Sequence, residues 1–128
     1  MDSILIIEDR EALRQTYALF LRKQGYGVRE AASVDEARSA LGHHRFDLIL
    51  SDYLLPGTNG LDFLSELRER ADETPVIIMT AFGEVALAVD AMRRGAFDFL
   101  EKPVDLNHLA IVIGRALEHQ TLKRRDGL

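Results

Sequence analysis

Residues 48–60 read Leu-Ile-Leu-Ser-Asp-Tyr-Leu-Leu-Pro-Gly-Thr-Asn-Gly. An apolar run ends in the carboxylate of Asp52, and a proline and two glycines follow, so this stretch predicts a buried strand that delivers Asp52 into a loop. Such runs are typical of parallel strands covered on both faces, and ligands gather outside the carboxyl ends of such strands. Aspartate is also a common turn residue, so the role of Asp52 depends on what neighbouring strands bring to the same edge.

The rest of the chain alternates apolar runs with helical patterns. We expect strands at residues 3–7, 28–31, 46–51, 76–79 and 97–100, where apolar and β-branched residues cluster. We expect helices at residues 11–24, 34–41, 61–70, 84–94 and 105–124, where apolar residues recur at helical spacing. Five strand-helix pairs in a row predict an α/β fold with a doubly wound, five-stranded parallel sheet and helices on both faces.

Composition limits what the chain can do. Its 128 residues fit one domain, and the absence of cysteine excludes disulfides, thiolate metal sites and cysteine nucleophiles. A net charge of -5 argues against a domain that grips nucleic acid through its phosphates. The first strand begins without a basic flank or cleavage site, and no apolar run reaches membrane-spanning length. We therefore expect a cytoplasmic protein without a membrane partner.

Polar side chains follow four of the predicted strands: Glu8, Asp9, Asp52, Thr80 and Lys102. The ends of parallel strands lie along one edge of the sheet, so three carboxylates, a hydroxyl and an ammonium can converge there. Clustered carboxylates repel one another and call for a divalent cation or raised pKa values, and Mg²⁺ fits best because it prefers oxygen ligands. A central carboxylate can attack phosphorus to form an acyl phosphate. The pattern therefore predicts phosphoryl transfer to Asp52.

In these motifs the chain resembles the receiver domain of two-component response regulators. The acid pair Glu8-Asp9, the 52–60 stretch, Thr80-Ala81 and Lys102-Pro103 stand in family order and spacing, and the match covers essentially residues 1–128. The resemblance implies a (βα)5 flavodoxin-like fold with strand order 2-1-3-4-5. It also implies a regulatory phosphoacceptor, not an enzyme, that assists its own phosphorylation and dephosphorylation after a sensor histidine kinase supplies the phosphoryl group.

The resemblance assigns roles to the residues around Asp52. Glu8, Asp9, Asp52 and the backbone carbonyl of Leu54 would surround Mg²⁺. Lys102 would contact the phosphoryl group on Asp52.

The resemblance also implies a conformational switch. Thr80 and Phe99 would be the switch pair: the hydroxyl moves toward the phosphoryl group while the ring turns inward and remodels the face of the fourth helix, fifth strand and fifth helix. The Lys102–Pro103 peptide bond is expected to be cis. Phe99 stands where many members have tyrosine, and Leu55 where many have methionine; neither change threatens the assignment.

A finer resemblance is to the receivers of nitrogen-regulation-type activators, which precede an AAA+ ATPase and a DNA-binding domain. It rests on residues 80–83, 88–92 and 96–103. It implies control of transcription, with DNA contacted only through an output domain beyond this chain and with the last helix running through residues 118–125 into a linker. The fourth and fifth helices carry more apolar residues than one core-facing stripe needs. This predicts a homodimer or domain interface there, unless both helices are simply well buried.

Three alternatives stay open. The chain could be a stand-alone receiver that acts by protein contact. It could be an aspartyl-nucleophile phosphatase, although Leu54 occupies the position two residues after Asp52 where a second carboxylate would act as general acid. It could bind flavin, although no Ser/Thr/Gly-rich phosphate loop follows the first strand.

Overall fold

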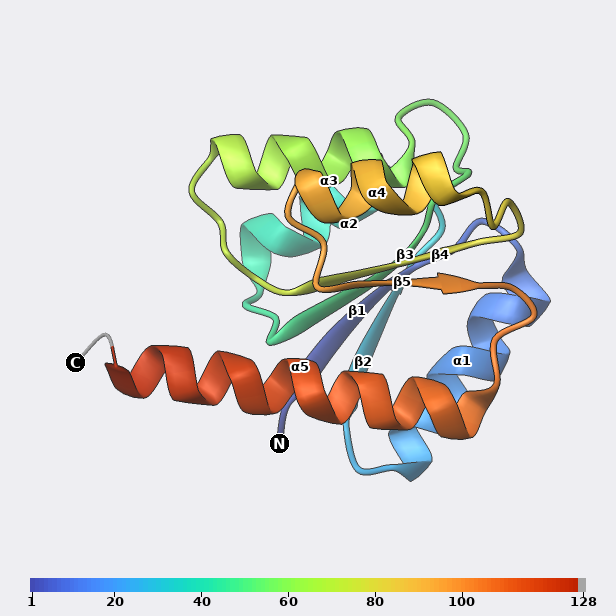
Figure 1. The fold of residues 1–128 in the computed structure, drawn as a ribbon. Helices are drawn as coiled ribbons and strands as arrows, with labels where there is room; N and C mark the ends of the chain where they lie inside the picture. The colour runs from blue at the N-terminus through green and yellow to red at the C-terminus, as the bar shows by residue number, and fades with distance from the viewer. Residues whose placement is uncertain (127–128) are drawn as a thin grey trace.

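The computed structural model describes residues 1–126, which form one parallel sheet with two helical layers (Figure 1). The strands are β1 (Ser3–Ile7), β2 (Gly27–Ala31), β3 (Leu48–Asp52), β4 (Val76–Thr80) and β5 (Asp98–Glu101). The helices are α1 (Glu11–Lys23), α2 (Val34–His43), α3 (Gly60–Glu69), α4 (Val85–Arg93) and α5 (Leu106–Asp126). The strand order β2-β1-β3-β4-β5 confirms the predicted doubly wound α/β fold.

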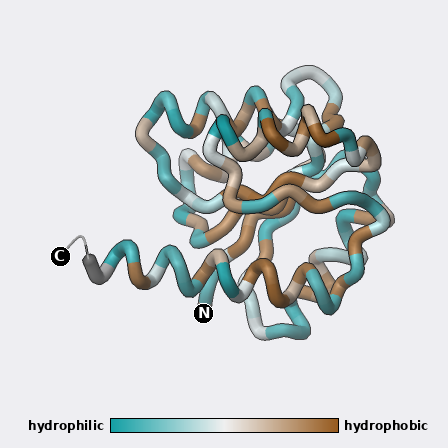
Figure 2. The backbone as a smooth tube through the Cα atoms, in the orientation of Figure 1, coloured by the Kyte–Doolittle hydropathy of each residue, from teal (hydrophilic) through white to brown (hydrophobic). Residues whose placement is uncertain are grey.

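The sheet separates two apolar cores because side chains alternate along each strand. On one face Ile7, Ile49 and Ile78 pack under α2, α3 and α4. On the other face Ile6 and Leu50 pack against α1 and α5. Figure 2 shows the same division, with hydrophobic strands at the centre and hydrophilic outer helix faces. All five residues of β3 are buried, so the end of this strand is held rigidly where Asp52 leaves it.

Side-chain caps mark where α2, α3 and α5 begin. The hydroxyl of Ser33 accepts a hydrogen bond from the N–H of Glu36 at the start of α2, and the side chain of Asn59 accepts one from the N–H of Asp62 at the start of α3. The carboxylate of Asp105 accepts a hydrogen bond from the N–H of Asn107 and begins α5. Helices start three to five residues after the ends of β1, β2, β4 and β5, whereas α3 starts eight residues after Asp52.

Six of the ten predicted strand boundaries are wrong by one or two residues: the start of β2, both ends of β3, the end of β4 and both ends of β5. The third strand begins at Leu48 and not at residue 46, because Asp47 bonds the first residue of β1 through both its backbone and its side chain. The fifth strand begins at Asp98 and not at residue 97. Between residues 1 and 126, no helix combines the length and apolar character needed to cross a bilayer.

Candidate functional site

Three carboxylates meet at the edge of the sheet where the parallel strands end. Glu8 and Asp9 follow β1, Asp52 ends β3, and these two strands are paired with Ile7 opposite Ser51. One carboxylate oxygen from each of the three acids lies within 4.8 Å of the others. Glu8 is fully buried and Asp52 is 7% exposed, whereas Asp9 is exposed. The cluster therefore presents one solvent-facing acid above two that are buried.

The ammonium of Lys102 lies among these acids from the end of β5. Its Nζ is 2.5 Å from Oε1 of Glu8 and 3.0 Å from Oδ2 of Asp52. Burial lowers the pKa of Lys102, but hydrogen bonds to Glu8 and Asp52 outweigh this effect and leave the pKa above its ordinary value. Three carboxylates meet here and only one ammonium contacts them, so the cluster has an excess of negative charge. A divalent cation with a preference for oxygen, such as Mg²⁺, matches both the donors and this charge.

The loop after Asp52 is folded tightly against the strand ends. The N–H of Tyr53 donates to the carbonyl of Met79 at 2.7 Å, and the N–H of Gly60 donates to the carbonyl of Tyr53 at 2.8 Å. A Cβ atom at Gly60 would collide with the carbonyl oxygen of Asp52. The glycine at position 60 therefore lets α3 start close enough to close the loop around the acids.

A cleft of about 400 Å³ opens over Asp52. Its walls include Asp9, Arg10, Leu54 and Lys102. Leu54 lines the same cleft as the acids and is largely exposed. A group of small-molecule size can thus reach the Asp52 carboxylate from solvent.

Thr80 and Phe99 lie beside the cleft on neighbouring strands. Thr80 is buried at the end of β4, and its hydroxyl accepts a hydrogen bond from the N–H of Phe82 at 3.0 Å. Because Ile78 is opposite Phe99, the side chains of Thr80 and Phe99 point to the same face of the sheet. Phe99 is half-buried in the core under α4 and does not line the cleft.

The Lys102–Pro103 peptide bond and Arg10 lie at this edge of the sheet, and the histidines lie away from the acids. The Lys102–Pro103 peptide bond is cis and directly follows the lysine of the site. The histidines have no predicted role: His43 lies at the end of α2, and the ring of His119 is tilted by 48° against that of Phe97, both outside the acid cluster. The sequence reasoning missed Arg10, although its place directly after Asp9 is itself a signal.

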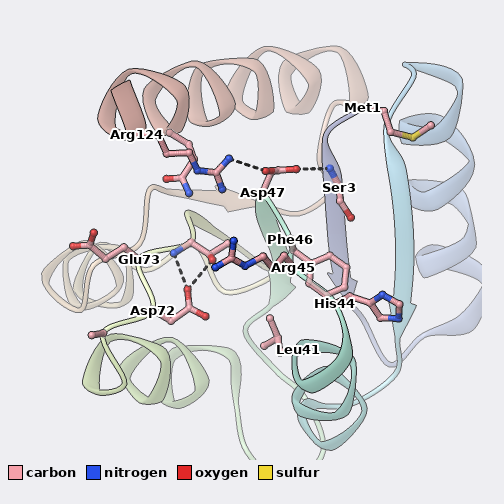
Figure 3. A pocket seen from close by; sticks show the side chains of 13 residues that line it. Met1, Ser3, Leu41, His44, Arg45, Phe46, Asp47, Asp72, Glu73 and Arg124 are labelled. Carbon is pink, nitrogen blue, oxygen red and sulfur yellow. Dashed lines mark hydrogen bonds and ion pairs between the residues drawn. The ribbon is translucent and has the colours of Figure 1, made fainter. Parts of the chain in front are cut away.

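A larger hollow of about 950 Å³ lies at the opposite end of the sheet (Figure 3). Its polar groups already bond one another: Arg124 pairs with Asp47 at 3.1 Å, Asp47 accepts from the N–H of Ser3, and Asp72 accepts from Thr74. The cleft over Asp52 is smaller but holds clustered like charges, which need an external partner. We therefore place the functional site at the cleft.

Comparisons with known proteins show which family and which relatives the chain is similar to. The family described as "Response regulator receiver domain" matches residues 4–113. Response regulator protein PilR of Pseudomonas aeruginosa is 40% identical over 113 residues, covering 88% of this chain and 25% of PilR. Alginate biosynthesis transcriptional regulatory protein AlgB of the same species is 38% identical over 122 residues, covering 95% of this chain and 27% of AlgB. The chain thus spans about a quarter of the length of these relatives.

Two solved structures share the whole architecture. NtrX from Brucella abortus has a TM-score of 0.91 and 35% identity, covering 99% of this chain and 30% of NtrX. The beryllofluoride-activated NtrC4 receiver domain dimer has a TM-score of 0.88 and 29% identity, covering 94% of this chain and 99% of that chain.

Proposed function

The chain belongs to the response regulator receiver domain family, and from this membership we propose that it is a phospho-accepting switch in which Asp52 takes a phosphoryl group from a sensor histidine kinase. The observation that carries the proposal is the Asp52 carboxylate on the floor of a cleft, 3.0 Å from the Lys102 ammonium and beside two further acids. Its relatives are nitrogen-regulation-type regulators, as the finer resemblance predicts.

The chemistry follows from the two oxygens of Asp52. Oδ2 accepts the hydrogen bond from Lys102, and Oδ1 has no hydrogen-bond partner within residues 1–126. Oδ1 is therefore the attacking atom: it forms a bond to phosphorus as the bond from phosphorus to the donor breaks. Lys102 compensates negative charge on the transferred group. The domain assists this reaction because these residues are already positioned.

A Mg²⁺ ion fits the same site. Glu8, Asp9, Asp52 and the carbonyl of Leu54 would hold it, and when bound it would neutralise charge on the phosphoryl oxygens. The support is the donor set itself, which consists of oxygens and brings three carboxylates together with one ammonium in contact with them.

The switch rests on the Thr80 hydroxyl. Phosphorylation adds a multiply charged acceptor next to Thr80, whose hydroxyl at present only accepts a hydrogen bond from Phe82. As the hydroxyl turns toward the phosphoryl group, the half-buried ring of Phe99 on the same face turns inward. This movement changes the surface made by α4, β5 and α5, and so biases a two-state equilibrium.

The output is a homodimer contact through α4 and α5. Val85, Val89 and Met92 form an exposed apolar stripe along α4, being 79%, 42% and 49% exposed. In α5 most residues of the apolar run are buried in the core, and Ile111 is exposed. The α4 helix therefore contributes more exposed apolar residues to this surface than α5 does. The NtrC4 receiver was solved as an activated dimer, which supports the same arrangement here.

The chain acts within a longer regulator of transcription. AlgB is named a transcriptional regulatory protein, and this chain covers only 27% of it. Residues 1–128 would then be the receiver, followed by a linker and an output domain that contacts DNA. The linker itself lies outside the described residues. A cytoplasmic location belongs to the same proposal.

The test is formation of an acyl phosphate. The protein is incubated with acetyl phosphate and Mg²⁺, and intact mass is measured for the wild type, Asp52→Asn and the control Asp2→Asn, which alters an exposed acid outside the cleft. We expect a base-labile adduct on the wild type and Asp2→Asn and none on Asp52→Asn. An undiminished adduct on Asp52→Asn would contradict the proposal.

A further inference from the structure

Two cations line the cleft over Asp52, and they differ in what they bind. The Lys102 ammonium already contacts both Glu8 and Asp52. Arg10 also lines the cleft, yet its guanidinium makes no hydrogen bond or ion pair within residues 1–126. Arg10 is exposed, so it carries a positive charge at the solvent side of the cleft that nothing in the described chain neutralises.

The backbone of Arg10 is fixed relative to the acids. Its N–H donates to Oε2 of Glu8 at 3.3 Å, and it is the N-cap residue that directly precedes α1. The neighbouring Arg14 differs: it bonds Glu30 and the backbone carbonyl of Glu8, and so holds β1, β2 and α1 together. The side chain of Arg10 makes no such contacts within residues 1–126, while its backbone is held by the hydrogen bond to Glu8.

In-line transfer gives the mouth of the cleft a chemical role. The attacking and leaving atoms lie on opposite sides of the phosphorus. Because Asp52 attacks from the floor, the leaving group faces outward, toward the exposed side where Arg10 lies. A guanidinium there binds an anionic leaving group well, since it pairs with carboxylates through two hydrogen bonds.

We propose that Arg10 is a specificity-determining residue that favours acyl phosphates, whose leaving group is a carboxylate, over phosphodonors with a neutral nitrogen leaving group. This rests on the proposed function of Asp52. It gives the domain a preferred class of small phosphodonor, separate from the phosphohistidine of a kinase, whose leaving imidazole offers Arg10 no negative charge.

The two reactions differ only in the bond that breaks. With acetyl phosphate, an Asp52 oxygen bonds to phosphorus, the bond from phosphorus to the acetyl oxygen breaks, and its electron pair leaves on acetate. With phosphoramidate, the bond from phosphorus to nitrogen breaks, and the nitrogen, already protonated, leaves as neutral ammonia. Negative charge develops on the leaving group only in the first reaction, so only that reaction gains from Arg10.

The test compares the two donors on the same protein. Rate constants for Asp52 phosphorylation by acetyl phosphate and by phosphoramidate are measured with Mg²⁺ for the wild type, Arg10→Gln and Arg10→Lys. Arg45→Gln is the matched control, because Arg45 is exposed at the opposite end of the sheet. We expect the rate constant with acetyl phosphate, divided by that with phosphoramidate, to fall about threefold in Arg10→Gln. Arg10→Lys should recover part of the ratio, and Arg45→Gln should keep the wild-type value.

Beryllofluoride separates this role from simple attraction of phosphate. It mimics the transferred group and has no leaving group, so Arg10→Gln should bind it as tightly as the wild type does. An unchanged ratio in Arg10→Gln, or a loss of beryllofluoride affinity that accounts for the change, would overturn the inference. If neither donor phosphorylates the wild type, the proposed function itself fails, which is a different result.

Discussion

Nζ of Lys102 lies 3.0 Å from Oδ2 of Asp52, so an ion pair joins the ends of β5 and β3 across β4. Both side chains are largely buried, and the same ammonium contacts the fully buried Glu8. One lysine therefore compensates two carboxylates that a folded core would otherwise leave unpaired. Removal of this lysine would leave both buried carboxylates without the cation that contacts them.

Replacement of Lys102 by methionine should destabilise the domain most when Mg²⁺ is absent. Without the ammonium, two buried carboxylates face each other, which should lower the free energy of unfolding by about 3 kcal/mol. Added Mg²⁺ should recover part of this loss, because a bound cation compensates the same charges. Urea unfolding of the wild type and of Lys102→Met, in EDTA and in Mg²⁺, measures the loss in free energy of unfolding in each condition.

Lys123→Met is the control for this effect. Lys123 is half-exposed and pairs with Glu73 on the surface, so its loss should cost less than about 1 kcal/mol in either condition. Equal losses in free energy of unfolding for Lys102→Met and Lys123→Met would show that the buried ion pairs contribute no more to stability than the surface pair does.

Two glycine substitutions should act in opposite directions. In Gly60→Ala the new Cβ meets the backbone carbonyl of Asp52, so we expect about 2 kcal/mol of destabilisation and slower phosphorylation. In Gly114→Ala the new Cβ meets open space on α5, and the better helix propensity should add about 0.5 to 1 kcal/mol. Thermal unfolding and phosphorylation rates are measured for both variants. If Gly60→Ala leaves stability and rate unchanged, the loop does not depend on the close approach of Gly60 to the carbonyl of Asp52.

Spontaneous loss of the phosphoryl group should be slow. Leu54 and Phe82 line the cleft with side chains 58% and 50% exposed, and neither can orient an attacking water by hydrogen bonding. Leu54→Asn together with Phe82→Glu should speed dephosphorylation about tenfold, measured as decay of the adduct after donor removal. Leu122→Asn, an equally exposed apolar site on α5, is the control. An unchanged decay in the double variant would refute this account of the water path.

Activation should increase self-association through α4. Val89 lies in the middle of the exposed apolar stripe, so Val89→Lys should weaken a dimer formed with beryllofluoride and Mg²⁺ without affecting their binding. Light scattering gives the mass in each state. Leu19→Lys, on the exposed side of α1, is the matched control. A dimer that survives Val89→Lys but not Leu19→Lys would place the interface elsewhere.

The sequence was sufficient for the fold and for the acids because both depend on local patterns. The apolar run that ends at Asp52 and the acid pair after β1 predict their own positions, and parallel pairing brings them to one edge. The ion pairs that fix neighbouring helices, such as Arg38 with Glu66 and Arg94 with Asp62, depend on how the helices sit on the sheet. No local pattern encodes that. Arg10 directly follows Asp9 in the sequence, but its place on the wall of the cleft is visible only in the folded structure.

The most direct test of the central claim is to locate the modified residue. Borohydride reduces an aspartyl phosphate to homoserine, and tandem mass spectrometry of a digest then identifies its position. After treatment with acetyl phosphate and Mg²⁺, the account predicts homoserine at position 52 and at no other acid. Homoserine at position 9, or none anywhere while the protein still binds beryllofluoride, would contradict Asp52 as the phosphoacceptor.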